Sequence, residues 1–170
     1  AVEQLRAEGY EAQFIALRLP YGVQSDAEDA DAAMRHIQPD RSLSINIQPA
    51  TDAVLHALRQ AGQSFTDAKQ RDFVMGNVKA RQRMLTCYAV AAAESGLVMG
   101  SDHAAEVVMG YFTKYGDGAA DLMPLAGLTK SQVRELAVQC DVPSYLVEKV
   151  PTADLESLAP LLPDEKSFGL

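Results

Sequence analysis

Short apolar segments that alternate with helical ones are the feature that most constrains the fold of this chain. Gln13–Leu19, Leu43–Ile47 and Leu97–Met99 each have the composition of a strand, and a segment with helical spacing follows each. Strands that alternate with helices form parallel sheets covered on both faces, because each helix crosses back over the sheet before the next strand begins. The sequence therefore predicts an α/β fold, a doubly wound parallel sheet with helices on both faces.

Several of the helical segments have recognisable ends. Ser25 is predicted to cap the helix Ala27–Ile37, whose first turn is acidic, and Thr129 with Gln132 forms a capping-box pattern at the start of Ser131–Gln139. The other predicted helices are residues 1–8, Asp52–Gln60, Asn77–Glu94, His103–Met109 and Ser144–Lys149. Prolines interrupt the chain after Asp141, and this tail is expected to wrap the domain or to become ordered against a ligand or partner.

The composition is that of an acidic globular chain. Its 170 residues, 48% of them hydrophobic, are enough for one domain over residues 1–170. The net charge of -8 argues against a general nucleic-acid binder, which needs a basic face. Cys87 and Cys140 suggest neither a disulfide framework nor a metal site, and no apolar run is long enough to cross a bilayer. We therefore expect a soluble, cytoplasmic protein with no membrane or nucleic-acid partner.

The two ends of the sequence look interrupted. Ala1 begins in the middle of an amphipathic helical pattern without a capping residue, and the chain stops at Phe168–Leu170 without a terminating signal. We interpret the chain as a fragment.

The segment from Gly100 to Leu125 concentrates the residues that could carry chemistry. Gly100–Asp102 follows a predicted strand, and the carboxyl ends of parallel strands open onto helix N-termini, which attract phosphate. Glu106 stands among apolar residues and needs a partner, either a divalent cation beside the phosphate or a basic side chain from elsewhere. His103 fits a capping or packing role better than that of a general base, and no zinc site is predicted.

Aromatic residues, glycines and a lysine follow in Phe112–Gly118. This polar, glycine-rich segment predicts a mobile loop over the same site, suited to stacking an aromatic ring and to neutralising a phosphate through Lys114. The alternative is an exposed loop of arbitrary content. Asp121 is an acid directly before an apolar run, and Lys130 is a base at a helix start, where the helix dipole favours acids. Residues that depart from such local preferences are often functional.

Four other basic residues are open to two interpretations each. Arg18 stands at the carboxyl end of a strand, where its guanidinium could bind phosphate, or it is a surface arginine. Lys79, Arg81 and Arg83 lie in one predicted helix, where positions two apart face different ways. At least one of them should point away from any site, and a solvated helix face is the simpler interpretation.

Six segments taken together resemble the ammonia-dependent NAD synthetases of the N-type ATP pyrophosphatase superfamily. They are RLPYGVQ (Arg18–Gln24), IQPDR (Ile37–Arg41), GNVKARQRM (Gly76–Met84), GSDHAAE (Gly100–Glu106), FTKYGDG (Phe112–Gly118) and PTADLE (Pro151–Glu156). The resemblance implies an adenine nucleotide alpha hydrolase-like fold and a homodimer with deamido-NAD bound at the subunit interface. The implied reaction uses Mg2+ and ATP to adenylate the nicotinate carboxylate of deamido-NAD, with release of pyrophosphate. Ammonia then attacks the adenylate to give NAD and AMP.

The resemblance also implies roles for single residues. Arg81, Lys114 and Asp121 match positions that contact deamido-NAD, and Lys114 matches the lysine that assists catalysis. Glu106 matches the magnesium ligand. The implied ATP contacts are Arg18, Ser101, Lys130 and Thr152. Serine stands at position 101 where the family usually has threonine, so the hydroxyl is retained.

Two parts of the family pattern are absent from these 170 residues: the SGGxDS pyrophosphate loop, with the aspartate that shares magnesium with Glu106, and a C-terminal His-Lys pair. Three functions therefore stay open. The chain could be the synthetase, a truncated chain that dimerises or binds dinucleotide without turnover, or another ATP pyrophosphatase that amidates a nucleotide base or an amino acid. The FTKYGDG pattern is of the shorter, ammonia-using type, which implies free ammonia as the nitrogen donor.

Overall fold

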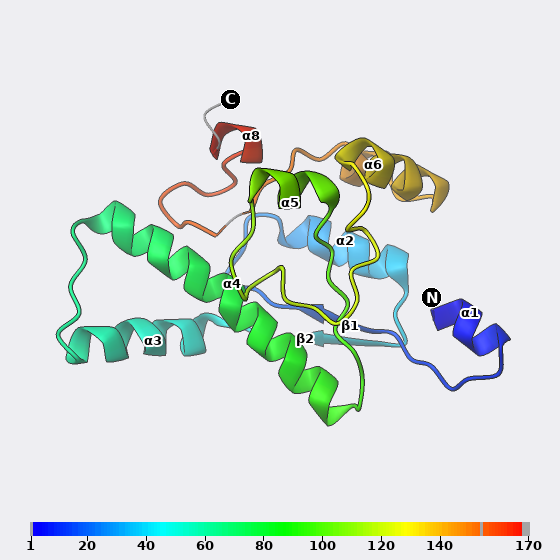
Figure 1. Cartoon of the computed structure of the whole chain (residues 1–170), viewed down its shortest axis with the longest axis horizontal. Coiled ribbons are helices and arrows are strands. Elements are labelled where there is room, and N and C mark those ends of the chain that lie inside the picture. Colours follow the sequence, from blue (N-terminus) through cyan, green and yellow to red (C-terminus); the bar gives the residue numbers. More distant parts are fainter. Residues whose placement is uncertain (1, 154, 168–170) are drawn as a thin grey trace. The chain divides into compact units, whose positions relative to one another are not determined.

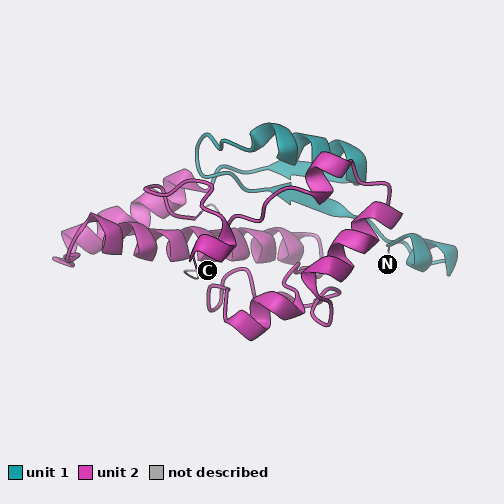
Figure 2. Ribbon diagram, turned by 90° about the horizontal axis from the view of Figure 1, so that it is seen from above, with its two compact units in different colours: residues 1–46 teal, residues 47–170 magenta. Residues whose placement is uncertain are grey.

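The computed structural model describes residues 2–153 and 155–167, so Ala1, Asp154 and Phe168–Leu170 lie outside the described residues. The chain forms two compact units, Ala1–Asn46 and Ile47–Leu170, drawn in teal and magenta in Figure 2. Each unit has its own secondary structure and is described by itself. The expectation of one domain over the whole chain stays a prediction.

The first unit is a strand–helix–strand arrangement preceded by a short helix. Its elements are α1 (Val2–Ala7), β1 (Ile15–Arg18), α2 (Ala27–Ile37) and β2 (Arg41–Ser44). The two strands are parallel and adjacent, with Ile15 opposite Arg41 and Arg18 opposite Ser44 (Figure 1). Parallel neighbours need a crossover connection, which α2 provides. This arrangement confirms the predicted α/β class with a parallel sheet.

The second strand lies earlier in the chain than Leu43–Ile47, the range predicted from its alternating pattern. It ends at Ser44, and Ile47 is instead buried as the N-cap residue of α3, with Pro49 in the first turn of that helix. Proline is favoured in a first helical turn because its missing N–H has no partner there. The Asn46 side chain binds the loop after β1 instead, since its Oδ1 accepts a hydrogen bond from Gly22 N at 3.0 Å.

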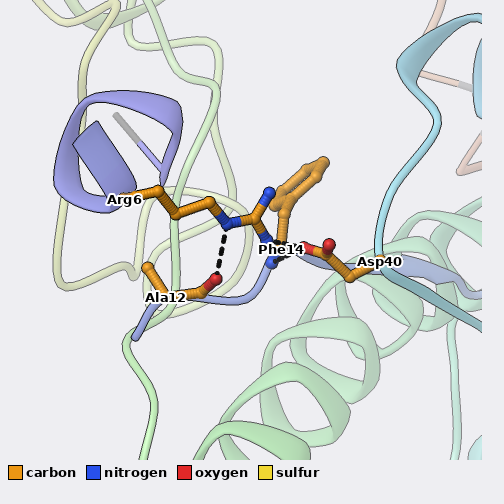
Figure 3. A network of polar contacts seen from close by, with 4 residues as sticks. All are labelled: Arg6, Ala12, Phe14 and Asp40. Carbon is orange, nitrogen blue, oxygen red and sulfur yellow. Dashed lines mark hydrogen bonds and ion pairs between the residues drawn. The ribbon is translucent and has the colours of Figure 1, made fainter. Parts of the chain in front are cut away.

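A polar network joins α1 to the starts of both strands (Figure 3). The Arg6 guanidinium donates to Asp40 Oδ2 at 2.6 Å and to the Ala12 carbonyl at 2.9 Å. Asp40 Oδ2 also accepts from Phe14 N at 2.7 Å. These donors, the Phe14 amide first and then Arg6, hold the pKa of Asp40 below its ordinary value of 3.8.

Helix α2 occupies the predicted range, but its cap differs from the prediction. The N-cap is Asp26 rather than Ser25, and its side chain makes no capping hydrogen bond. Glu28 and Asp29 in the first turn favour the helix electrostatically, so the start does not depend on a hydroxyl cap. Gln38, in the left-handed conformation at a φ of 49°, ends the helix before Pro39.

The second unit is mostly helical among its described residues. Its helices are α3 (Gln48–Gln60), α4 (Ala68–Ala93), α5 (Ala104–Met109), α6 (Lys130–Gln139), α7 (Ser144–Val147) and α8 (Asp164–Ser167). Helices α3 and α4 contact each other, as do α6 and α7. The core is small: Ile47, Met75 and Ala80 are buried in this unit, and Ala16 in the first. No helix in the described ranges is both long and apolar enough to cross a membrane.

Helix α4 begins well before Asn77, where the sequence pattern placed its start. Asp67 caps it by accepting a hydrogen bond from Gln70 N at 2.7 Å, and Gln70 Oε1 accepts one from Thr66 N at 2.7 Å. An aspartate followed three residues later by glutamine is a helix-start signal that the sequence offered. Gly76 lies in the middle of the helix, and because glycine is unfavourable there, the predicted helix began only after it.

Leu97–Met99 does not form the predicted buried strand. Met99 makes one isolated parallel bridge with Leu122, and the Leu97 and Met99 side chains are 70% and 49% exposed. The backbone of Val98 is bonded to a loop instead, since its N–H donates to Asp121 Oδ2 at 2.7 Å and its carbonyl accepts from Asp121 N at 2.9 Å. A strand needs a continuous ladder, and this segment has none among the described residues.

The C-terminal part forms a closed loop that the sequence did not predict. Thr152 and Pro163 form an antiparallel bridge, Asp164 N donates to the Pro151 carbonyl at 3.0 Å, and α8 follows. The predicted short helix at Ser144 is confirmed as α7. The tail is thus folded on itself despite its lack of periodicity.

Candidate functional site

The turn before α5 forms one side of the site. Ser101 is exposed, whereas Asp102 and His103 are only 7% and 5% exposed. Ala104 N donates to the Leu128 carbonyl at 2.9 Å, which ties the start of α5 to the segment that leads into α6. This hydrogen bond explains why residues from two predicted helix starts lie together.

Glu106 is oriented by its own helix start and faces a lysine. Its Oε2 accepts a hydrogen bond from His103 N at 3.1 Å, one half of a capping box. Its Oε1 lies 3.9 Å from Lys130 Nζ and 3.3 Å from His103 Nε2. Of the two partners that the sequence left open for this acid, a basic side chain is therefore present. His103 is the N-cap residue, as its predicted capping or packing role requires.

Three carboxylates create a negative field at this turn. The pKa of Asp102 is raised above its ordinary 3.8, chiefly by burial and then by the charges of Asp117 and Glu106, with His103 opposing the shift. Sequence reasoning missed Asp102, although an acid next to the hydroxyl of Ser101 at a predicted strand end was the available signal. The field favours a cation beside these groups.

These residues can help to hold Mg2+, but they do not form a cage for it. Among the described residues, no group of three or more His, Cys, Asp or Glu side chains could hold a metal ion by itself. Magnesium is usually bound by one or two carboxylates, by water and by substrate phosphates. Glu106, half-buried and with Oε1 directed toward Lys130 rather than satisfied by a backbone donor, fits that pattern.

The loop after α5 is attached to α4 by hydrogen bonds. Arg81 Nε donates to the Lys114 carbonyl at 3.1 Å, and the Thr113 hydroxyl donates to Asn77 Oδ1 at 3.0 Å. Thr113 N donates to Asp117 Oδ1 at 2.8 Å, which closes the loop internally. The structure thus brings Arg81 to the backbone of Lys114, and their common substrate stays a prediction. The Lys114 ammonium is exposed, 5.2 Å from the ring centre of its neighbour Tyr115.

Asp121 connects the same helix to the turn at Val98. Its Oδ2 accepts from Val98 N at 2.7 Å and its Oδ1 from the Tyr88 hydroxyl at 3.3 Å. Tyr88 lies two helical turns beyond Arg81 on α4, so both residues are on one face of the helix. The three residues predicted to contact deamido-NAD therefore all reach this face.

Two predicted ATP contacts, Arg18 and Thr152, do not belong to the turn before α5 or to the start of α6. Arg18 is in the first unit, where it donates to Asp31 Oδ1 at 2.8 Å and to the Ala27 carbonyl at 3.5 Å, and its Nε is buried without a hydrogen bond. Thr152 is at the base of the closed loop, paired with Pro163. Asp154, part of the PTADLE segment, lies outside the described residues.

The solvated-face interpretation of Lys79 is wrong. Lys79 is 4% exposed and its ammonium donates to the Leu155 carbonyl at 2.7 Å and to the Ser157 hydroxyl at 2.8 Å. Arg81, two positions on, faces the Lys114 loop, so the expectation that these bases point in different directions is confirmed. Burial of Lys79 could not be read from a pattern, because its acceptors lie more than seventy residues away in the sequence.

Known proteins resemble the chain over nearly its whole length. The family model for NAD synthase matches residues 2–170. The NH(3)-dependent NAD(+) synthetase of Paraburkholderia phytofirmans is 56% identical over all 170 residues, which is 59% of that protein. The chain thus spans about 60% of the length of the curated relatives that it matches.

Solved structures agree with this assignment. The NAD+ synthetase of Burkholderia pseudomallei has a TM-score of 0.81 and 54% identity, covering 95% of this chain and 59% of that one. An NMN synthetase from Francisella tularensis has a TM-score of 0.77 and 40% identity, covering 92% of this chain and 61% of that one. The predicted adenine nucleotide alpha hydrolase-like α/β fold is confirmed by these likenesses. Because the family model matches residues 2–170 and relatives are identical to the chain at more than half of the positions over its whole length, the chain belongs to the NAD synthase family.

Proposed function

We propose that the protein takes part in the ATP-dependent amidation of deamido-NAD by ammonia, which yields NAD, AMP and pyrophosphate through an adenylated intermediate. The observation that carries the proposal is the common attachment of the Arg81 and Lys114 pair and of Asp121 to one face of α4. These are the residues that the family resemblance assigns to deamido-NAD. The printed names of the relatives, NH(3)-dependent NAD(+) synthetase, support the same reaction.

The proposed ATP site uses the turn before α5 and the start of α6. The Ser101 hydroxyl and the Lys130 ammonium would bind phosphate or ribose oxygens, with Thr152 as a further contact. Arg18 belongs to the other unit, and its assignment to ATP rests on the family resemblance alone. Glu106 would share Mg2+ with the phosphates, and the ion would neutralise their charge. A cation at Glu106 would supply the positive charge that Lys130 supplies in this structure. The Lys130 ammonium, 3.9 Å from Glu106 Oε1 on a side chain that is 38% exposed, would then be available to ATP.

The Lys114 loop would serve the transferring group. Adenylation develops charge on phosphate oxygens, and a positioned ammonium stabilises that charge without reorganisation. Arg81 holds the loop at the Lys114 carbonyl, so Lys114 is placed by its backbone while its side chain stays free to reach substrate. Free ammonia and a homodimeric assembly complete the proposal on the strength of the family resemblance. A cytoplasmic location completes it on the strength of the composition.

A second acceptor deserves a test because one structural relative is an NMN synthetase at 40% identity. That protein's name says that it synthesises NMN, a mononucleotide, rather than the dinucleotide NAD. The deamido-NAD assignment rests on Arg81, Lys114 and Asp121, and a mononucleotide would lack the adenylate half of that ligand. The non-catalytic alternative, a chain that binds dinucleotide or dimerises without turnover, differs from both by forming no adenylate. Another ATP pyrophosphatase would release AMP only with a different acceptor, a nucleotide base or an amino acid.

One assay distinguishes these functions. NAD, NMN, AMP and pyrophosphate are measured with Mg2+-ATP, ammonium and either deamido-NAD or nicotinate mononucleotide, for these 170 residues and for the chain extended through its natural reading frame. We expect NAD from the extended chain and little from the shorter one, because the phosphate-binding loop of the family is not among these residues. Formation of NMN in place of NAD would favour the mononucleotide. Binding of deamido-NAD without AMP release from either protein would support the non-catalytic alternative.

A further inference from the structure

One face of α4 holds a buried polar contact that the proposed substrate roles do not use. Lys79 donates to the Leu155 carbonyl at 2.7 Å and to the Ser157 hydroxyl at 2.8 Å. Two turns earlier, Asp72 Oδ1 accepts from Ser157 N at 3.0 Å, and its Oδ2 from Leu158 N at 2.7 Å. A lysine and an aspartate on one helix face therefore bind the same short stretch of chain, residues 155–158.

Gly76 lies between these two residues on the same face. A Cβ at this position would be 3.3 Å from Leu155 Cβ and 3.4 Å from the Leu155 carbonyl carbon. Glycine is unfavourable in a helix interior, so its presence in the middle of α4 needs a reason. The close approach of Leu155 supplies one: the helix and residues 155–158 are in direct contact from Asp72 to Lys79.

The bound stretch belongs to the closed loop whose base contains Thr152. The base is held by the Thr152–Pro163 bridge and by the hydrogen bond from Asp164 N to the Pro151 carbonyl at 3.0 Å. The Tyr111 hydroxyl, just beyond α5, donates to Asp164 Oδ1 at 3.1 Å. Thr152 is thus held by this base, and the contact with α4 begins three positions further along the chain, at Leu155.

The same helix also holds the other substrate loop. Asn77 and Arg81, each two positions from Lys79 and therefore on the opposite side of α4, bind Thr113 and the Lys114 carbonyl at 3.0 and 3.1 Å. Helix α4, the long green helix of Figure 1, has 26 residues and is the common support of both loops. A change at Lys79 would shift one loop relative to the other.

We propose that Lys79 is a positioning residue, which places Thr152 for ATP at a fixed separation from the Lys114 loop by binding residues 155–158 to α4. The inference rests on the proposed function, because Thr152 is assigned to ATP there. Loss of the ammonium would leave a carbonyl and a hydroxyl without their donor, and the stretch would move toward water. Lys79 would touch no substrate itself.

The test compares substitutions on one helix, in the protein expressed from its complete natural reading frame. Lys79→Met removes the ammonium but keeps the aliphatic stem, and Lys69→Met makes the same change at an exposed position of α4. ATP and deamido-NAD affinities are measured by calorimetry, and amide hydrogen exchange is followed at Ser157 and Leu158. We expect Lys79→Met to accelerate exchange at these two amides and to weaken ATP binding about tenfold, with deamido-NAD binding nearly unchanged. Lys69→Met should change neither, and Lys79→Arg should recover part of the ATP affinity.

Ser157→Ala removes only one acceptor, and it decides the question if Lys79→Met does not fold. A smaller loss of ATP affinity with faster exchange at Leu158 supports the proposal. Faster exchange with unchanged ATP affinity overturns it, and so does an equal loss of both ligands, which would indicate general loss of structure. If wild-type protein binds ATP but forms no amidated product, the proposed function is wrong. The ATP affinities of wild type and of the variants would still decide the role of Lys79.

Discussion

Glu106 shows how one side chain can serve both the backbone and a ligand. One carboxylate oxygen accepts from His103 N and completes the start of α5, while the other faces Lys130 at 3.9 Å. The sequence indicated an acid in need of a partner, because Glu106 is surrounded by apolar residues. Which partner it has could not be predicted, since Lys130 is 24 positions away and is brought near by the hydrogen bond between Ala104 and Leu128.

Glu106→Gln separates the two roles of this residue. The amide oxygen of glutamine can still accept from His103 N, so α5 should stay folded, but the charge that would attract magnesium is lost. In the protein expressed from its complete reading frame, we expect the magnesium-dependent rate to fall at least about tenfold, or about 1.4 kcal/mol of barrier. Deamido-NAD binding without ATP should stay near normal. An unchanged rate at limiting magnesium would exclude the metal role of Glu106.

Asp40 offers a pH-dependent test of the first unit. Hydrogen bonds from Phe14 N and Arg6 lower the pKa of Asp40 in the folded protein. The carboxylate therefore stabilises the fold fully at pH values above the ordinary pKa of 3.8, and this stabilisation is lost as the pH falls through the lower pKa of the folded state. Asp40→Asn should therefore lower Tm at about pH 7, and the difference from wild type should narrow at about pH 3. Thermal unfolding by circular dichroism measures both. Glu11→Gln, at an exposed residue, is the control; a difference that is independent of pH would contradict the assignment.

At the scale of elements, short-range signals predicted helices better than strands. The range of α2 was predicted correctly, and the capping box before α6 is present, with Thr129 Oγ1 accepting from Gln132 N at 3.3 Å and Gln132 Oε1 accepting from Thr129 N at 2.9 Å. Both depend on neighbours within one turn. The failure at Leu97–Met99 has the opposite cause, because a strand exists only if another segment pairs with it.

The cap of α6 gives a prediction at the same scale. Thr129→Ala removes the side-chain acceptor for Gln132 N, and N-cap replacements of this kind cost about 0.5–2 kcal/mol. We expect the free energy of unfolding to fall by about 1 kcal/mol in urea titrations. Ser131→Ala, at an exposed position in the same helix turn, should change it much less. Equal effects of the two substitutions would show that the cap contributes nothing specific.

At the scale of the whole molecule, long-range hydrogen bonds take the place of a large core. Few hydrophobic side chains are buried among the described residues, whereas Asp72, Lys79, Arg81 and Tyr88 each connect α4 to a distant loop. A ligand that binds these loops in the folded state, and not the unfolded chain, would add to the stability of the fold. Ligand binding should therefore be visible in the unfolding equilibrium.

ATP binding gives the corresponding prediction. A ligand at about 100 times its Kd stabilises the folded state by about 2.7 kcal/mol, if it does not bind the unfolded chain. With Mg2+-ATP, we expect a stabilisation of this order in the protein expressed from its complete reading frame, and a much smaller one in Lys130→Ala. GTP serves as the control ligand. If Mg2+-ATP stabilises wild type and Lys130→Ala equally, Lys130 does not bind ATP.

The sequence by itself determined the family, the α/β class and the six segments that carry the family resemblance. It could do so because motifs and helix caps are local, and the order of the six segments is preserved along the chain. Only the tertiary structure decided which residues meet: Glu106 with Lys130, Arg81 with the Lys114 carbonyl, and buried Lys79 with Leu155 and Ser157. These pairs are far apart in sequence, and the free energy that orders them depends on burial and on hydrogen-bond geometry, which no local pattern contains.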